Sequence, residues 1–196
     1  MSTATATATA SSHTGTVLAD LLPASRVRDA ALVLGGAALT GLAAQIAVPV
    51  PGSPVPVTGQ TFAALLVGTS LGARRGVASL ALYALAGLMG VPWFASGTSG
   101  LSVSFGYILG MLLASAAVGA LARRGADRGV LRMAATMVLG EAVIYAIGVP
   151  YLAFAAGMSA SAAIAAGLTP FLIGDAVKAL LAMGAMPAAW KLVGQR

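Results

Sequence analysis

The sequence has little charge and no cysteine. Only 8% of its 196 residues are charged, whereas soluble globular domains carry roughly 25%. Without cysteine, the chain has neither a disulfide nor a thiolate metal site. It also lacks a His/Asp/Glu cluster with the spacing of a metal site, and it has no G-x-x-x-x-G-K-[ST] loop. We therefore expect no metal centre, no resident cofactor and no ATP hydrolysis by this chain.

Apolar and small residues are abundant instead. Hydrophobic residues make up 59% of the chain, 25 residues are glycine, and the mean hydropathy is +0.94. This composition predicts an all-α integral membrane protein with one compact domain. Apolar runs near the length that crosses a bilayer predict six transmembrane helices. These spans lie near residues 30–48, 58–71, 77–91, 104–121, 133–152 and 168–193.

The positions of the basic residues predict the topology. Every lysine and arginine except Lys178 falls before span one, between spans two and three, between spans four and five, or near the end of the chain. The intervening segments 49–57, 92–103 and 153–167 carry no charge. By the positive-inside rule, the membrane domain 26–196 lies in the plasma membrane with both termini cytoplasmic. The net charge of +6 then reports topology and not nucleic-acid binding.

The first 25 residues have a different composition. Met1–Ser12 is a low-complexity Ala/Thr/Ser tract without the basic and apolar regions of a signal peptide. We predict that residues 1–25 form a disordered cytoplasmic tail. The only histidine, His13, falls within this tail and is expected to be solvated.

Prolines mark the ends of the spans that are predicted to face outward. Spans one, three and five each end in Val-Pro, at Pro49, Pro92 and Pro150, where proline is expected to stop the helix. Residues 48–57 read Val-Pro-Val-Pro-Gly-Ser-Pro-Val-Pro-Val, which predicts two extended arms around a central turn. This Pro-rich outer loop between the first two helices is interpreted as a lid, with an ordinary ordered loop as the alternative.

An acid and a base interrupt the last apolar run. Asp175 and Lys178 are three residues apart, so a helix places them on one face. An ionised side chain at the centre of a membrane-spanning helix costs roughly 2.5–3.5 kcal/mol on insertion scales, and such residues normally mark a pathway or a binding site. We therefore predict a polar site here, with a purely structural ion pair as the alternative.

Further polar and aromatic residues lie near the predicted outer ends of the spans. Four of them are candidates for the substrate-binding site: Gln45, Trp93, Tyr107 and Tyr145. An interfacial aromatic belt would also explain the aromatic residues. Glu141 lies deeper, about two turns into span five, and is interpreted as a cap or a partner of the nearby Arg132.

Small residues line one face of the first span. They are Gly36, Ala37, Thr40 and Gly41. Small residues at four-residue spacing let helices approach closely. This face is predicted to dock to a separate membrane subunit, and packing within the chain is the alternative.

Seven ordered segments, within about residues 30–185, resemble the BioY family. They are Ala43–Ile46, Pro54–Thr61, Leu71–Gly76, Leu85–Phe94, Gly106–Tyr107 with Gly110, Ile144–Leu152 and Pro170–Lys178. BioY proteins are six-span substrate-capture (S) components of energy-coupling-factor (ECF) biotin transporters. This chain differs from many relatives at Ser102–Tyr107, where they have Gly-Pro-Thr-Gly-Gly-Tyr.

The resemblance implies high-affinity binding and uptake of biotin. It implies that Asp175 and Lys178 contribute to biotin binding, and that the partners are a transmembrane coupling subunit and two ATPase subunits, which alone use ATP. Asp175 is expected to accept from a ureido N–H, while Lys178 meets a ligand oxygen or pairs with Asp175. Tyr107 and Tyr145 would contribute aromatic walls with polar tips.

Two other functional classes remain open at this point. A standalone proton-coupled secondary transporter of a small anionic solute would use Asp175 or Glu141 as the proton-carrying group. Gly97–Gly100 matches the GxSG of rhomboid proteases, but such a serine needs a base and the only histidine is in the amino-terminal tail. We therefore do not expect an enzyme.

Overall fold

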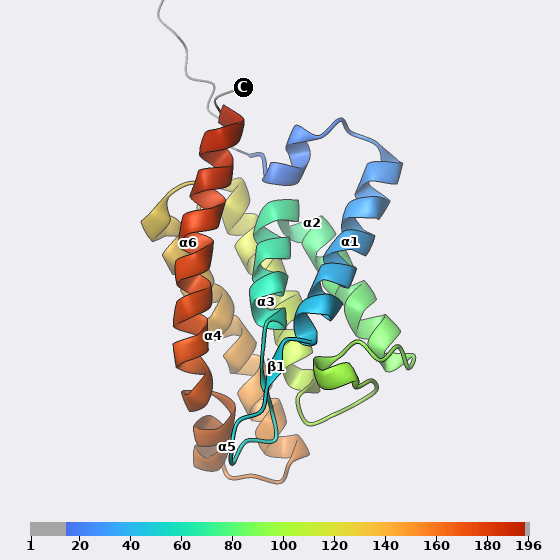
Figure 1. Cartoon of the computed structure of the whole chain (residues 1–196), viewed down its shortest axis with the longest axis vertical. Helices are drawn as coiled ribbons and strands as arrows, with labels where there is room; N and C mark the ends of the chain where they lie inside the picture. Colours follow the sequence, from blue (N-terminus) through green and yellow to red (C-terminus); the bar gives the residue numbers. More distant parts are fainter. Residues whose placement is uncertain (1–14, 195–196) are drawn as a thin grey trace, which may run out of the picture.

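The structure is a computed structural model that describes residues 15–194. The predicted disorder of residues 1–14, including His13, lies outside the described residues. The helices and short 3-10 turns are η1 (Leu18–Leu21), α1 (Arg26–Ala44), α2 (Gln60–Leu88), η2 (Ala95–Gly97), α3 (Phe105–Arg123), α4 (Val130–Ala155), α5 (Ala160–Gly167), η3 (Thr169–Phe171) and α6 (Leu172–Gly194). Most helices run along the long axis of the molecule (Figure 1).

Four helical segments in the described part of the chain are long and apolar enough to cross a membrane. They are Arg26–Ala44, Phe105–Arg123, Val130–Ala155 and Ala160–Val193. The predicted helical membrane class is therefore supported, whereas the count of six spans and the cytoplasmic termini stay predictions. Both ends of the described chain lie at the upper end of the molecule in Figure 1.

Helix α2 consists of two antiparallel arms that meet at Gly72. Gly72 has φ +79°, a backbone conformation that glycine adopts without steric cost. The Tyr83 hydroxyl donates to Gln60 Oε1 at 2.9 Å, although these residues are 23 positions apart and would lie about 34 Å from each other in a continuous helix. The two arms correspond in place to the predicted spans 58–71 and 77–91.

The segment between α1 and α2 forms a small hairpin at the opposite end from the termini (Figure 1). Strands β1 (Ala47–Val48) and β2 (Val57–Thr58) pair antiparallel, with Ala47 opposite Thr58. Gly52 has φ +80°, and Ser53 N–H donates to the Val50 carbonyl at 3.1 Å, which closes the turn. Prolines elsewhere in the loop cannot donate a ladder hydrogen bond, so the pairing stays short.

Proline does not stop every helix as predicted. Helices α1 and α2 end before Pro49 and Pro92, but Pro150 lies inside α4, which continues to Ala155. The prediction that Pro150 ends its helix is therefore wrong. Proline removes one helical hydrogen bond and disturbs one turn. The turn after Pro150 stays helical because its residues pack in the core, where Leu152 is fully buried.

The small face of α1 packs inside the chain. Thr40 and Ala37 are buried, and a Cβ atom added at Gly36 would lie 2.9 Å from the Cβ of Ser79 on α2. A Cβ atom at Gly41 would lie 3.0 Å from the Trp93 ring. The structure thus shows the packing alternative, and it corrects the prediction that this face docks to another subunit, because its surface is already covered by α2 and the loop that follows.

Residues 15–22 are folded, in contrast to the predicted tail. Val17 is fully buried and η1 lies across the helix ends. Asp20 pairs with Arg75 at 2.8 Å and with Arg123 at 3.3 Å. Burial acts to raise the pKa of the Asp20 carboxyl, but hydrogen bonds from Arg75 and the Val17 N–H, together with the charges of both arginines, outweigh it and hold the pKa below its ordinary value. Apolar burial and ion pairing explain why this part of the segment is ordered.

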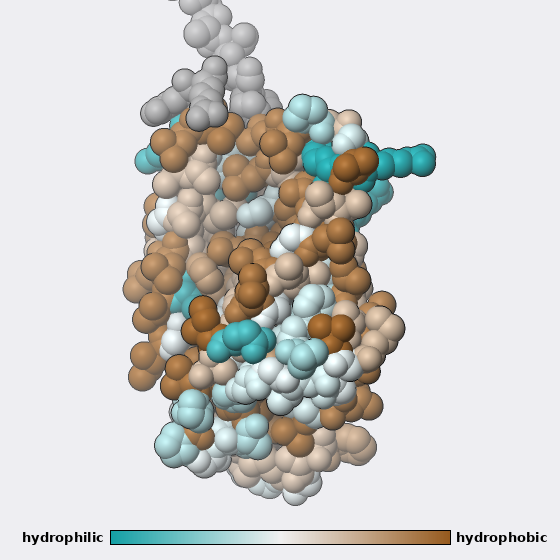
Figure 2. Space-filling view, turned by 45° about the vertical axis from the view of Figure 1, so that its right-hand side comes forward, coloured by the Kyte–Doolittle hydropathy of each residue, from teal (hydrophilic) through white to brown (hydrophobic). Residues whose placement is uncertain are grey.

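Large apolar side chains remain exposed along the sides of the molecule. On α1 and α6 they include Leu34, Leu42, Ile173, Leu180 and Leu181. Figure 2 shows hydrophobic side chains spread over the face in view, with hydrophilic side chains at the upper end and a second hydrophilic area in the lower half. Such an apolar belt is what a protein presents to lipid. The fold therefore places the buried polar residues behind a lipid-compatible wall.

Candidate functional site

The acid and base predicted from the sequence form a buried ion pair on α6. Lys178 Nζ lies 2.9 Å from Asp175 Oδ1, and the two side chains are 12% and 9% exposed. Their spacing of three residues places them one above the other on the helix. Lys178 Nζ also donates to Thr61 Oγ1 on α2 at 2.9 Å. The pair therefore faces the interior of the helix bundle and links two helices.

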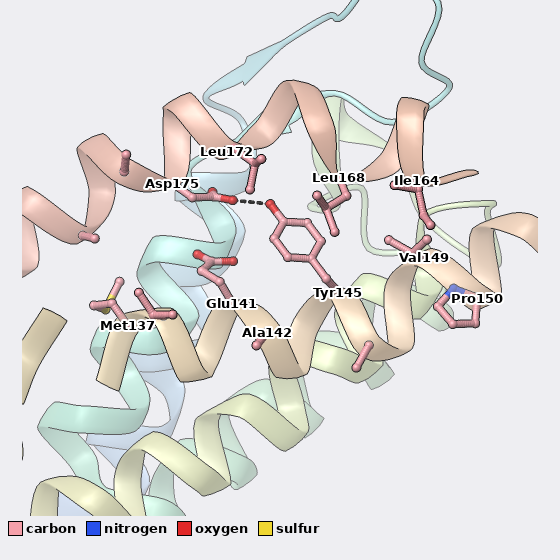
Figure 3. A pocket seen from close by; sticks show the side chains of 14 residues that line it. Met137, Glu141, Ala142, Tyr145, Val149, Pro150, Ile164, Leu168, Leu172 and Asp175 are labelled. Atoms are coloured by element: carbon pink, nitrogen blue, oxygen red, sulfur yellow. Dashed lines mark hydrogen bonds between the residues drawn. The ribbon is translucent and has the colours of Figure 1, made fainter. Parts of the chain in front are cut away.

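Helix α4 adds two residues to this cluster. The Tyr145 hydroxyl donates to Asp175 Oδ2. Glu141, one turn earlier on α4, is buried, and neither of its carboxyl oxygens has a hydrogen-bond partner within residues 15–194. Figure 3 shows Glu141 and Tyr145 pointing from α4 toward Asp175 on α6. Helices α2, α4 and α6 thus bring together one base, two acids and two hydroxyl groups.

The interpretation of Glu141 as a partner of Arg132 is wrong. Arg132 is exposed near the beginning of α4, whereas Glu141 is buried against α6. Nine residues of helix separate the two by about 13 Å along the axis, which is too far for an ion pair. Glu141 therefore belongs to the polar cluster and not to the charged end of the helix.

Two cavities adjoin the cluster. A small enclosed cavity of about 20 Å³ lies on one side, lined by Val55, Pro56, Thr58, Gln60, Thr61, Ala95, Ser104, Tyr107, Tyr145, Phe171, Asp175 and Lys178. A more open groove of about 730 Å³ lies between α4, α5 and α6, and Glu141 lines it. Asp175 and Tyr145 line both cavities. Their hydrogen bond therefore forms part of the wall that separates the enclosed cavity from the groove.

Aromatic rings line the enclosed cavity. The Tyr107 ring packs against Tyr145 and Phe171, with ring centroids 6.4 Å apart in each pair. The Tyr107 hydroxyl donates to the Gly167 carbonyl at 2.7 Å. Tyr107 therefore offers the cavity an aromatic face, while its hydroxyl is used to hold the end of α5.

The structure brings four of the six predicted binding residues to this site. Asp175, Lys178, Tyr107 and Tyr145 line the enclosed cavity, but Gln45 and Trp93 do not. The Gln45 amide donates to the carbonyls of Gly41 and Trp93 at 2.9 and 3.0 Å, and Trp93 Nε1 donates to the Tyr83 carbonyl at 3.0 Å. These two residues stay predictions for the binding site, and their polar atoms join α1 and α2 to the loop that follows α2.

Two members of the cluster were not among the predicted binding residues. The only sequence signal at Thr61 is its position at the start of a predicted span. Its contact with Lys178 could therefore be found only from the fold. Glu141 carries a usable signal, since an ionisable residue inside a membrane span is a candidate for function by default. No group of three His, Cys, Asp or Glu residues in the described ranges could hold a metal ion.

The departure from the family pattern at residues 102–107 lies beside the cavity. Ser104 and Tyr107 line it, and the hydroxyls of Ser102 and Ser104 are 3.0 Å apart. Serine side chains therefore supply polar atoms in this loop. They can donate and accept hydrogen bonds, which keeps this wall of the cavity able to bind a polar ligand.

Comparisons with known proteins identify similar sequences and a similar fold. The BioY family model matches residues 10–195. Biotin transporter BioY2 of Lactococcus lactis subsp. cremoris is 35% identical over 153 residues, which cover 76% of this chain and 83% of that protein. The probable biotin transporter BioY of Pyrococcus horikoshii is 35% identical over 158 residues, covering 81% and 93%. The crystal structure of an S-component for biotin from an ECF-type ABC transporter matches with a TM-score of 0.77 and 19% identity over 86% of this chain and 95% of that one.

Proposed function

Because this chain belongs to the BioY family, we propose that it binds biotin and mediates biotin uptake as the S component of an ECF-type transporter. It is a multi-pass membrane protein with an S-component fold. The observation that carries the binding function is the buried Asp175–Lys178 pair at the base of an aromatic cavity. A pair of charges held inside a membrane helix is a functional site by default.

The chemistry of biotin fits the lining of this cavity. Biotin has a ureido ring with two N–H donors and one carbonyl acceptor, a thiophane ring, and an apolar chain that ends in a carboxylate. Lys178 supplies donors and positive charge, while Tyr107, Tyr145 and Phe171 supply apolar faces. The polar cluster would orient one end of the ligand, and the aromatic rings would bury its apolar part.

Ligand entry requires movement of the hairpin between α1 and α2. The enclosed cavity of about 20 Å³ has room for roughly one water molecule, which is much less than biotin needs. Val55, Pro56 and Thr58 of the hairpin form part of its wall. We therefore assign the hairpin as a lid that opens for biotin and closes over it.

The wider arrangement follows from the family and the charge pattern. The domain would have six spans in the plasma membrane, with residues 15–25 and the end of α6 on the cytoplasmic side. Since the sequence has no phosphate-binding G-x-x-x-x-G-K-[ST] loop, ATP would be used by two partner ATPases, coupled through a transmembrane subunit. The chain itself would be neither an enzyme nor a holder of a cofactor.

Equilibrium binding of biotin to the purified protein tests the proposal. The substitution Asp175→Asn removes the charge that holds Lys178 and is expected to weaken binding about 10- to 100-fold, the effect of losing a hydrogen bond to a charged group. Asp127→Asn is the matched control, because Asp127 is also buried but accepts from Trp190 Nε1 at 2.7 Å, away from the cavity. Biotin affinity equal to the wild type in Asp175→Asn would rule out this site.

One observation favours the alternative of a standalone proton-coupled transporter, namely the buried and unpartnered carboxyl of Glu141. That function predicts biotin uptake by vesicles that contain this chain alone, driven by a proton gradient. Uptake only when the coupling subunit, the ATPases and ATP are present would exclude it.

A further inference from the structure

We propose that Glu141 is a ligand-binding residue, which accepts a hydrogen bond from a ureido N–H of biotin while Lys178 donates to the ureido carbonyl. This inference rests on the proposed function and names the recognition of the ligand's urea group.

The first argument is the state of the Glu141 side chain. Glu141 is 8% exposed, and both of its carboxyl oxygens are without a hydrogen-bond partner within residues 15–194. A buried carboxyl group without donors is unfavourable, so it persists only where another interaction uses it. Its side chain lies on the face of α4 that lines the groove and points toward α6 (Figure 3).

The second argument is a count of donors and acceptors around the cluster. Each Asp175 oxygen already accepts one hydrogen bond, from Lys178 and from Tyr145. Lys178 uses two of its three N–H groups, on Asp175 and Thr61. The groups left over include one lysine N–H donor, the hydroxyl hydrogen of Thr61, which interacts with Glu141, the unused lone pairs of Asp175 and the two oxygens of Glu141. A urea group offers the complement, a carbonyl acceptor next to an N–H donor.

The third argument is position. Glu141 interacts electrostatically with both Asp175 and Lys178, and it lines the same groove as Tyr145 and Asp175. The Tyr145–Asp175 hydrogen bond separates that groove from the aromatic cavity. If the Tyr145–Asp175 hydrogen bond opens, a ligand whose urea group enters the cluster contacts Glu141. The apolar chain of the ligand then lies among the aromatic rings of the cavity.

The test compares three variants with the wild type. Biotin is titrated into wild type, Glu141→Gln, Glu141→Leu and the control Thr136→Val. Thr136 is buried on the same helix, but its hydroxyl donates to the Arg132 carbonyl and it lines neither cavity. Thermal unfolding without ligand accompanies each titration.

We expect Glu141→Leu to weaken biotin binding about 10- to 100-fold and Thr136→Val to leave it unchanged. Glu141→Gln keeps an acceptor oxygen, so it should weaken biotin binding less than Glu141→Leu does. Neither Glu141 variant should unfold at a lower temperature than the wild type, since an unpartnered buried acid is removed.

The outcomes separate this inference from the function on which it rests. Wild-type protein that binds biotin, together with a Glu141→Leu affinity within about twofold of it, overturns the role of Glu141 alone. Lower unfolding temperatures in both Glu141 variants assign Glu141 a structural role instead and also overturn it. Wild-type protein that binds no biotin overturns the proposed function and this inference with it.

Discussion

Replacing Lys178 by methionine tests how the buried ion pair contributes to stability. Methionine is similar in size to lysine but cannot donate, so the change removes the 2.9 Å contacts to Asp175 and to Thr61. Asp175 would keep the Tyr145 hydroxyl as a donor and would have no opposite charge beside it. Removing one partner of a buried pair costs about 3–5 kcal/mol, because the other charge stays buried.

The double variant Asp175→Asn/Lys178→Met separates charge from packing. Both members of the pair are then neutral, and asparagine can still accept from Tyr145. Replacing a buried ion pair by neutral groups of similar size is often neutral or stabilising. The double variant should therefore regain most of the lost stability, to within about 1 kcal/mol of the wild type, while biotin binding stays weakened.

Thermal unfolding in detergent, followed with and without biotin, measures both effects. Loss of 3–5 kcal/mol corresponds to a fall in the unfolding temperature on the order of 10 °C for a domain of this size. Lys191→Met, at an exposed position of the same helix, is the control and should change little. If Lys178→Met unfolds at the wild-type temperature, or if the double variant is no more stable than the single one, the pair is not the buried charge couple described here.

Three further predictions follow from single contacts. Tyr107→Phe should lower stability by about 1 kcal/mol but leave biotin affinity within about threefold, because its hydroxyl is bonded to backbone and not directed at the ligand. Gly36→Leu should destabilise the protein by about 1–3 kcal/mol in a thermal scan while Gly35→Leu should not, since only the former position is packed against another helix. The pKa of Asp20 is lowered in the folded protein, so its ion pairs with Arg75 and Arg123 stabilise the amino-terminal segment at pH values above the unfolded-state pKa of about 3.9. This stabilisation is lost as the pH falls through the lower folded-state pKa. Limited proteolysis of the segment should therefore increase in that acid range, and the Asp20→Asn variant should be cleaved readily at all pH values.

The polar site shows which contacts can be read along the chain. Asp175 and Lys178 are one helical turn apart, so the sequence was enough to predict that they share a face, and it left open whether they pair. Their contacts with Thr61 and Tyr145 join residues 117 and 30 positions apart. Such contacts depend on how the helices pack, which periodicity within one helix does not report.

The same limit explains the contacts that the sequence did not show. Gln45 and Trp93 have the depth and chemistry of site residues, but tertiary packing directs their polar atoms to backbone carbonyls. The small face of α1 has the composition of a docking surface, but α2 covers it. Val17 lies close to a low-complexity tract, and its burial depends on distant parts of the chain such as the bend of α2 at Gly72.

The sequence by itself determined the helical membrane class, the family and the acid–base pair on the last helix, because hydropathy, ordered motifs and helical spacing are all local properties of the chain. Only the tertiary structure decided that Glu141 joins this pair, that α2 folds back at Gly72 and that the small face of α1 is internal. These features arise where separate helices meet, and the free energy of burying or pairing a side chain depends on what lies across that contact.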